Sequence, residues 1–515
     1  CFLVHLMMVV IKKKNKSGSV SIQILLKEGE KNKLIKSIGS AIEESDIAVL
    51  LAKAQQEIQL LSRQRSLFVH AKDAAIESFI TELSNGQIRT IGPELVFGRL
   101  YDYIGYSAID KDLFRHLVIA RLAFPLSKLK TIEYLYRFQG VTLDLDSVYR
   151  FLDKLNNELK EQVEQISFNH TKRILKDDLS IVFYDMTTLY FEASDEDDLR
   201  KTGFSKDGKH SNPQIYLGLL VGLGGYAIGY EIFEGDIYEG HTLIPVIEKM
   251  SQKFSLNKPI IVADAGLLSN DNIKALEESG YEYILGARIK NENKETVEKI
   301  LSADLKNGEY LIINKLQHKL IVQYSEKRAR KDAHNRERGL RRLEKQIKTG
   351  KLTKSNINNR GYNKYLIMQG EVVISIDMNK YIKDGQWDGL KGYITNAKLK
   401  PEEIIANYKN LWYIEKAFRM SKTDLRIRPI YHRLRKRIEA HICLSFVAYS
   451  IYKELERVLK IEHYPLSVEK AAEITHNMYQ IEIMLPESKQ TKNILLKTDS
   501  LQAQLIQIIN KNYPG

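Results

Sequence analysis

The spacing of apolar residues predicts that the first third of the chain is mostly helical. From Ala41 to about Asn85 apolar residues recur every three or four positions. Ser40, with Glu43 three residues later, is typical of the cap that opens such a helix. The same spacing returns over residues 96–175 and predicts further helices at Asp112–Leu122, Lys130–Tyr136 and Ser147–Ile166.

Two regions of the chain predict strands instead. Residues 7–38 predict a basic hairpin, with turn-forming residues between Val9–Lys13 and Ser19–Leu26. From residue 179 onward short apolar runs first form a hairpin and then alternate with helical segments, which predicts a mixed sheet covered by helices. These elements are strands Leu179–Asp185, Ile215–Phe233 (a hairpin), Pro259–Ala263, Tyr281–Leu285 and Gly389–Thr395, and helices His241–Phe254, Asn270–Ser279, Pro401–Lys422 and 432–459.

Residues 291–386 interrupt this alternation with short strands at 309–324 and 364–377 around a very basic stretch, 326–351. That stretch holds 11 Lys or Arg and 4 acids, a net charge of +7, with opposite charges four residues apart. It predicts either a solvated surface helix or a helix that contacts phosphates.

Composition narrows the class of protein. The 515 residues include 78 Lys and Arg against 65 Asp and Glu, a net charge of +13 that favours a polyanionic partner. The two cysteines, Cys1 and Cys443, exclude a disulfide framework and a Cys-rich zinc site, and fit a reducing compartment. The apolar run Cys1–Ile11 is too short to span a bilayer, and Ile215–Tyr230 is broken by glycines, so we expect a soluble, intracellular protein. Because the chain begins with Cys1, we expect Met7 or Met8 as the natural start, or a fragment.

Two aspartates occupy equivalent places at the ends of buried strands. Asp185 follows Ile181–Tyr184, and Asp264 follows Ile260–Ala263. In open α/β sheets ligands gather at such strand ends. An aspartate that merely caps the next helix is the alternative for each of them taken alone.

A third acid, Glu415, lies in the predicted helix Pro401–Lys422. Tyr408, Leu411, Trp412, Glu415, Arg419 and Lys422 recur at three or four residues and would share one face of that helix. A face that mixes an acid, two bases and two aromatic residues suits a wet active site better than a core. The alternative is a surface pair between Glu415 and Arg419.

Three carboxylates without His or Cys partners favour Mg²⁺ or Mn²⁺ over zinc. Two such ions about 4 Å apart would activate a water or a 3′-hydroxyl and stabilise the leaving oxygen in phosphodiester displacement. Nearby lysines and arginines, with Arg288 and Lys206 among the candidates, would hold the phosphates.

At this point the motifs resemble the DDE transposases of bacterial insertion sequences, in the group whose acidic helix reads Tyr-x2-Arg-x3-Glu-x6-Lys. Tyr408, Glu415 and Lys422 match, while Leu411 replaces the arginine, for which Arg419 could substitute. The resemblance covers roughly residues 176–460. It also rests on the segments Tyr184–Thr188, Gly203–Asp207 with Pro213–Gln214, Val262–Gly266, Tyr393–Asn396 and Arg428–His432.

The resemblance implies an α/β fold with a ribonuclease H-like mixed sheet flanked by helices, in which Asp185, Asp264 and Glu415 converge on two Mg²⁺ ions. Mn²⁺ could replace Mg²⁺. It implies cut-and-paste transposition in the bacterial cytoplasm, with association with the nucleoid when bound. The partners would be double-stranded DNA, both terminal inverted repeats and target, and a second copy in the synaptic complex. The residues expected to contact DNA are Tyr408, Trp412, Arg419, Lys422, Arg288 and Lys206.

The predicted organisation has a basic N-terminal hairpin (1–40), a helical, DNA-binding region (41–175) and a catalytic core in two parts (176–290 and 387–460). A β-rich insertion with the basic helix (291–386) separates the two parts, and a helical tail (461–515) follows. Two alternatives stay open: a structure-specific nuclease on the same scaffold, and a DNA-binding remnant that no longer catalyses. Strand joining would separate the transposase from the nuclease.

Overall fold

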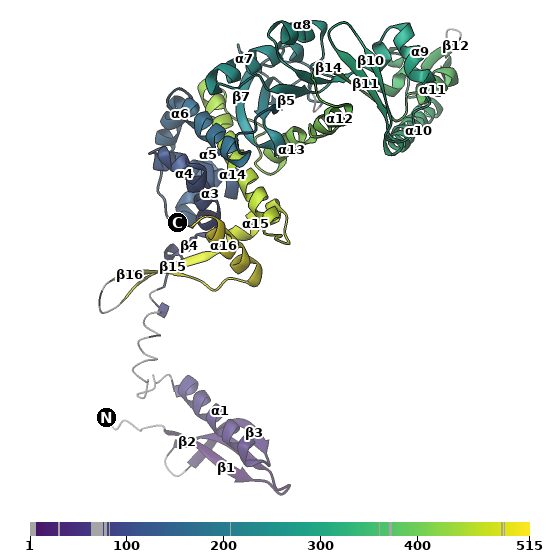
Figure 1. Ribbon diagram of the computed structural model, residues 1–515. Helices are drawn as coiled ribbons and strands as arrows, with labels where there is room; N and C mark the ends of the chain where they lie inside the picture. Colours follow the sequence, from purple (N-terminus) through teal and green to yellow (C-terminus); the bar gives the residue numbers. More distant parts are fainter. Residues whose placement is uncertain are drawn as a thin grey trace. The chain divides into compact units, whose positions relative to one another are not determined.

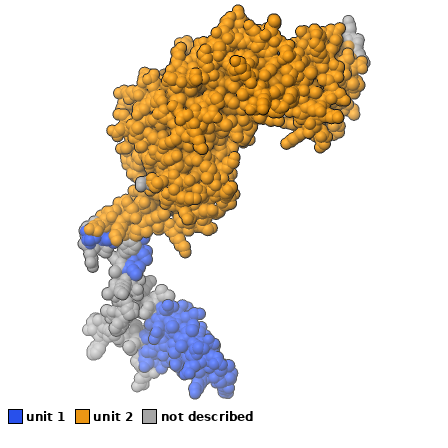
Figure 2. All heavy atoms as spheres, in the orientation of Figure 1, with its two compact units in different colours: residues 1–85, 485–489 blue, residues 86–484, 490–515 orange. Residues whose placement is uncertain are grey.

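The computed structural model describes residues 7–28, 31–62, 76, 80–81, 83–205, 208–359, 361–369, 373–485, 488 and 490–514. The chain forms two compact units, residues 1–85 with 485–489 and residues 86–484 with 490–515 (Figure 2). None of the described helices is both long and apolar enough to cross a membrane.

The smaller unit is a three-stranded antiparallel sheet with one helix packed on it. Its elements are β1 (Met7–Lys14), β2 (Val20–Glu28), β3 (Lys31–Ala41) and α1 (Glu44–Ser62). The two predicted strands are confirmed, but the sequence analysis missed β3. Ser40 was wrongly predicted as a helix cap: it lies in β3, where its hydroxyl is 2.7 Å from that of Ser21 on β2. Pairing with β2 therefore holds this segment extended, and the helix begins at Glu44.

The larger unit begins with the predicted helices. α4 matches its predicted range within one residue, whereas α6 is longer than predicted at both ends. Asp144 accepts from Ser147 N and caps the start of α6. The elements here are β4 (Ile88–Thr90), π-helix Glu94–Gly98, α3 (Arg99–Ile104), α4 (Asp112–Ala123), α5 (Lys128–Tyr134), π-helix Leu135–Gln139 and α6 (Leu145–Ile174).

An eight-stranded mixed sheet forms the centre of this unit, with the order β10-β11-β14-β9-β8-β5-β6-β7 (Figure 1). β5 pairs in parallel with β8, and β8 with β9, while the other neighbours are antiparallel. The predicted mixed α/β class is thereby confirmed. The strands are β5 (Ile181–Tyr190), β6 (Gln214–Val221), β7 (Ala227–Glu234), β8 (Ile260–Ala263), β9 (Tyr283–Ala287), β10 (Tyr310–Asn314), β11 (Lys319–Tyr324) and β14 (Leu390–Thr395).

The predicted insertion at 291–386 differs from the expectation in one respect. Its strands β10 and β11 extend the central sheet, because β11 pairs with β14. α9 (Lys294–Ser302) also packs on the central sheet, since Ile300 belongs to its core. The remainder forms a small helix-and-hairpin body around its own core of Leu343, Tyr365 and Leu366. Its elements are α10 (Glu326–Lys348), β12 (Leu366–Gln369), β13 (Val373–Ile376) and α11 (Met378–Gly385).

The predicted helix Pro401–Lys422 is broken into two. α12 (Pro401–Lys409) ends where the backbone hydrogen bonds no longer join residues four apart but residues three apart. Leu411 N donates to Tyr408 O, and Tyr413 N donates to Asn410 O. Hydrogen bonds of this kind tighten the chain locally, and α13 (Trp412–Thr423) follows as a separate helix. The six-residue stripe expected from the sequence is confirmed only in part: Tyr408, Leu411 and Glu415 line one cavity, whereas Arg419 lines another.

The C-terminal region is also less helical than expected. After α14 (Arg435–Ile461) and α15 (Val468–Ile474), β15 (Tyr479–Met484) pairs with β16 (Thr491–Leu495) and with β4. The last helix is α16 (Ser500–Asn512). A three-stranded sheet thus joins residues from both ends of the larger unit.

The two faces of the central sheet are covered by different helices. α7 (Leu243–Phe254) and α8 (Asn270–Glu278) contribute apolar side chains to the core on one face. The larger core on the other face takes its residues from α3, α4, α6, α12, α13 and α14. α14 is almost wholly buried and packs on α4 and α6.

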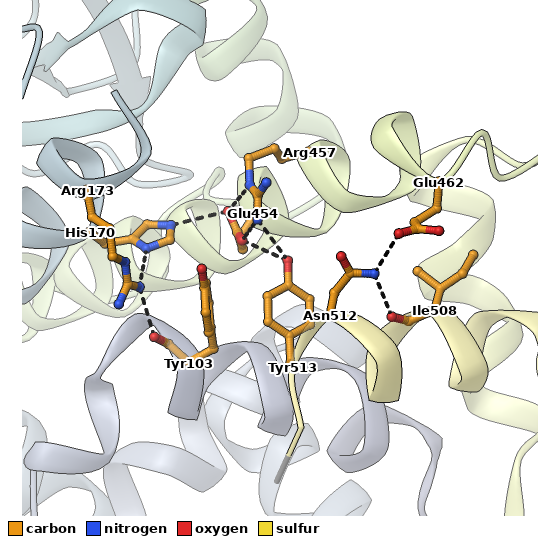
Figure 3. A network of polar contacts seen from close by, with 9 residues as sticks. All are labelled: Tyr103, His170, Arg173, Glu454, Arg457, Glu462, Ile508, Asn512 and Tyr513. Carbon is orange, nitrogen blue, oxygen red and sulfur yellow. Dashed lines mark hydrogen bonds and ion pairs between the residues drawn. The ribbon is translucent and has the colours of Figure 1, made fainter. Parts of the chain in front are cut away.

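A buried polar network holds α14 in place (Figure 3). Glu454 accepts two hydrogen bonds from Arg457, at 2.6 and 2.9 Å, and one from the Tyr513 hydroxyl at 2.7 Å. His170 Nε2 on α6 lies 3.3 Å from Glu454 Oε2. Burial alone would raise the pKa of Glu454, but the bonds from Arg457 and His170 outweigh it and lower this pKa to about 2.

Candidate active site

The first two predicted acids lie side by side on neighbouring strands. In the parallel register of β5 and β8, Tyr184 pairs with Ala263. The next residue on each strand is the predicted acid, Asp185 on β5 and Asp264 just past β8. Neighbouring strands are about 4.8 Å apart, so the register brings together two carboxylates that are 79 residues apart in sequence.

Both aspartates belong to the sheet face that α13 covers. Successive side chains of a strand alternate between faces, so Asp185 shares its face with Phe183, and Asp264 with Val262. Phe183 and Val262 belong to the same core as Ile414 of α13, and α13 packs against β5. Glu415 follows Ile414 in the first turn of that helix.

Backbone donors fix the orientation of both aspartates. Asp264 Oδ1 accepts from Gly266 N at 2.8 Å and from Leu267 N at 3.3 Å. Asp185 Oδ1 accepts from Met186 N at 2.7 Å. A Cβ at position 266 would lie 2.9 Å from Asp264 Oδ1 and 3.4 Å from Glu239 Oε2, so glycine leaves room for two acids at this turn.

A cavity of about 670 Å³ brings the third acid to the second. Asp264 and Glu415 both line it, with Lys391, Tyr408 and Leu411 among the other lining residues. The walls come from β14, which carries Lys391, the turn after β8, the end of β11 with the start of α10, and the two helices on either side of the break.

One hydroxyl is under the influence of all three acids. The pKa of Tyr408 is raised well above its ordinary value, chiefly by burial and further by the negative charges of Asp264, Glu415 and Asp185. The Tyr408 ring packs edge-on against Tyr393, with centroids 4.9 Å apart. Tyr408 is therefore a neutral phenol that can donate a hydrogen bond at pH 7.

Lys391 is a cation that lines the same cavity as Asp264 and Glu415. Burial lowers the pKa of Lys391, as does the neighbouring Arg328, while Asp264 and Glu415 raise it. The Lys391 ammonium also lies 5.0 Å from the centre of the Tyr408 ring. The cavity therefore combines acids with a cation in reach of them.

Within the described part of the chain, no three Asp, Glu, His or Cys side chains stand close enough together to hold a metal ion as they lie. The donor chemistry nevertheless fits a divalent ion. Asp185 and Asp264 offer hard oxygen ligands from adjacent strands, and Glu415 lines the cavity beside Asp264.

Comparison with known families decides the class of protein. A family described as "Transposase DDE domain" matches residues 176–451, more than half of the 515 residues. The chain belongs to this transposase family. A transposase cuts and joins DNA, so the coarse prediction of a DNA-acting enzyme is confirmed.

No curated protein matches this transposase in sequence. Among solved structures it is similar to a piggyBac transposase synaptic complex with hairpin DNA, at 8% identity over 82% of this chain and 81% of that chain, with a TM-score of 0.37. It is also similar to a Drosophila P element transposase strand transfer complex, at 11% identity over 79% and 99%, with a TM-score of 0.20. A Mos1 transposase paired-end complex matches at 15% identity over 35% and 57%, with a TM-score of 0.16. Because these TM-scores are low, membership of the transposase family rests on the family match over residues 176–451.

The structure separates the residues predicted to contact DNA. Tyr408 is buried in the cavity wall, and Arg288 lies beside Asp264, because its Nε donates to Ala265 O at 3.1 Å. Trp412 is 47% exposed at the start of α13. Arg419 lines a different cavity, with Lys416 and residues of α14 and α15, and Lys422 lies in the last turn of α13. Lys206 lies outside the described residues.

Three residues of the site were missed by the sequence analysis: Lys391, Arg328 and Glu239. A signal existed for Lys391, since it alternates with Tyr393 in a strand whose side chains are otherwise mostly apolar or small. Arg328 was counted only as one charge of the basic stretch, although it lines the cavity. Glu239 had no pattern to distinguish it from other loop acids.

Proposed function

We propose that this transposase belongs to an insertion sequence, cleaves the element ends with the help of divalent metal, and joins them to target DNA by cut-and-paste. The observation that carries the proposal is the β5–β8 register, which sets Asp185 beside Asp264, with Glu415 and Asp264 lining one cavity. A ribonuclease H-like core is part of this proposal. The antiparallel strands β7-β6-β5 followed by the parallel strands β8 and β9 support it.

Asp185, Asp264 and Glu415 would hold Mg²⁺ or Mn²⁺, and the bound metal would supply an activated water or 3′-hydroxyl and a stabilised leaving oxygen. Lys391 and Arg328 line or adjoin the cavity as cations, and they would hold the phosphate whose charge increases in the transition state. Tyr408 would donate to an oxygen of the substrate, because its raised pKa keeps it protonated.

Other residues would position the duplex around this cavity. Trp412 presents an exposed ring on which a base can stack, and Arg288 would contact a phosphate near the Asp264 turn. Leu411 is buried and lines the cavity, and Arg419 faces a different one. Lys391 is thus a better substitute than Arg419 for the signature arginine. Residues 41–175 remain the predicted DNA-binding region.

The direct test measures cleavage of a duplex that carries the terminal inverted repeat of the element, with Mg²⁺ present. Asp185→Asn, Asp264→Asn and Glu415→Gln should each lower the cleavage rate at least about a hundred-fold while leaving duplex binding within about two-fold. Asp146→Asn and Glu298→Gln replace exposed acids of α6 and α9 and should leave the rate unchanged.

The same assay separates the alternatives. Cleavage without strand joining would indicate a nuclease, and binding without cleavage by the unaltered chain would indicate an inactive remnant. Normal cleavage by any of the three acid variants would remove that residue from the site.

A further inference from the structure

A second cavity, of about 440 Å³, lies between the ends of α4 and α5, α6, and the segment that joins α13 to α14. The basic residues that line it are Arg121, Lys128, Lys130, Arg426 and Arg428, together with His432 and His441. None of the described residues that line it is an acid. The proposed catalysis makes no use of this cavity.

Two of these cations are buried. Arg121 is 5% exposed and Lys128 is 6% exposed. Arg121 Nη2 lies 2.8 Å from His441 Nε2 and donates to Ser445 Oγ at 3.2 Å, while its buried Nε has no hydrogen-bond partner. No hydrogen bond or ion pair joins Lys128 Nζ to any residue that the structure describes.

The surrounding acids are already neutralised by other cations. Asp153 on α6 is held by Arg437, at 2.6 and 3.0 Å, and lies 3.4 Å from Lys436 Nζ. Glu133 lies on the exposed side of α5, where it pairs with Lys130 at 2.8 Å. Neither carboxylate compensates the charge of Arg121 or Lys128.

The two histidines add no negative charge, and their protonation is opposed by the same cations. Burial, with Lys128 and Arg121, lowers the pKa of His432 to about 4 and that of His441 well below its ordinary value. Burial, with Arg121, likewise lowers the pKa of Lys128 to about 7. Arg121 of α4 and Lys128 of α5 therefore face one another beside neutral histidines, and none of the described residues that line the cavity is an acid.

A buried cation without a counter-charge is unfavourable, and an anion that enters the cavity would relieve it. Arginine and lysine are the side chains that proteins use for phosphate, because they donate several charge-assisted hydrogen bonds. We propose that this cavity, lined by Arg121, Lys128 and the segment Arg426–His432, is a binding site for a phosphate oxyanion.

The position of the cavity in the fold suggests two sources for that phosphate. The Arg426–His432 segment follows α13, the helix of Glu415, and is joined to the end of β5, since Ile430 N donates to Tyr190 O at 3.3 Å. Arg428 lies 5.7 Å from the centre of the Tyr190 ring, and Tyr431 at the cavity is 71% exposed. The phosphate could thus belong to a DNA backbone held near the acids, or be a free phosphate.

The first experiment uses sulfate and inorganic phosphate as probes on the full chain. Each should raise the unfolding temperature of the unaltered chain, by several degrees at saturation, relative to sodium chloride of equal ionic strength. Lys128→Gln should lose this rise, Lys128→Arg should keep it, and Lys274→Gln, an exposed lysine of α8, should behave as the unaltered chain does.

Proton uptake gives a readout that a purely structural role of Lys128 would not change. An anion beside Lys128 raises its pKa from about 7, so sulfate binding at pH 7.5 should take up a proton. Sulfate itself does not titrate in this range. Calorimetry in two buffers of different ionisation enthalpy should show the uptake in the unaltered chain and none in Lys128→Gln.

The second experiment distinguishes the sources by the salt dependence of binding to a non-specific DNA duplex, without metal. If the site holds a backbone phosphate, Lys128→Gln should lower the slope of log K against log salt by about one. An unchanged slope together with a sulfate or phosphate response would assign the site to a free phosphate. If Lys128→Gln changes neither the salt slope of DNA binding nor the rise in unfolding temperature with sulfate or phosphate, the proposal is wrong. This result does not depend on the outcome of the cleavage assay.

Discussion

Lys391 is the residue whose role is most sharply constrained by its surroundings. It is the cation that Asp264 and Glu415 both influence, and it contacts the ring of Tyr408. Lys391→Gln should lower the cleavage rate about ten-fold or more, because the reacting phosphate would lose a donor. Lys398→Gln, which replaces an exposed lysine just beyond β14, is the matched control. Equal cleavage rates for the two variants would exclude Lys391 from the chemistry.

Glu454 should govern part of the acid stability of the larger unit. Its pKa is about 2 in the folded chain against an ordinary value of 4.5, so its contribution is fully present above pH 4.5 and is lost as pH falls toward 2. Glu454→Gln should lower the free energy of unfolding by about 3 kcal/mol at pH 7, and by much less at pH 3. Urea unfolding at both pH values checks this, and an equal loss at both would contradict it.

At this scale the sequence pattern was enough to predict all three acids as candidates before any family was considered. Asp185 and Asp264 each end a short apolar run, and strand ends are where a sheet presents polar groups. Glu415 was singled out by a helix face that mixes an acid, bases and aromatic residues, and the resemblance to a known family then matched it to a signature position. Lys391 was missed because a single lysine in an otherwise apolar or small strand is only a weak signal until its neighbours across the sheet are known.

The turn between α12 and α13 is the element whose structure departs most from its sequence pattern. The three- and four-residue spacing of Tyr408 to Lys422 predicted one continuous helix. Asn410 is a weak helix former, and the backbone hydrogen bonds around it join each N–H to the carbonyl three residues earlier instead of four. Tyr408 and Leu411, on either side of this turn, still line one cavity with Glu415, whereas Arg419, one turn further along α13, lines another with residues of α14 and α15.

The close approach of β9 to α12 should be essential for the site. A Cβ on Gly286 would meet the Tyr408 hydroxyl and lie 2.9 Å from Ala265 N, next to Asp264. Gly286→Ala should therefore reduce cleavage strongly while leaving the fold intact by circular dichroism. Adding Tyr408→Phe removes the clashing hydroxyl but not the backbone contact.

The comparison that isolates the clash is between Gly286→Ala with Tyr408→Phe and Tyr408→Phe alone. The double variant should cleave more than Gly286→Ala and no better than Tyr408→Phe. If Gly286→Ala cleaves as the unaltered chain does, the packing of α12 on the Asp264 turn is not required.

For the whole molecule, long-range strand pairing set the limit of sequence-based prediction. β11 and β14 pair although some 70 residues separate them. Because of this pairing, β10 and β11 belong to the central sheet and not to a separate insertion as expected. β15 pairs with β4 from the opposite end of the larger unit. Local patterns predict strands but not partners, whereas the order β5-β8-β9 follows from the alternation of strand and helix.

The central claim is that Asp185, Asp264 and Glu415 hold the same metal ions. Its most direct test is a crystal structure of the transposase with a DNA duplex and Mn²⁺, with data collected at the manganese absorption edge. The account predicts anomalous peaks bound by Asp185, Asp264 and Glu415, on the sheet face covered by α13. Manganese bound elsewhere, or held without Glu415, would contradict it.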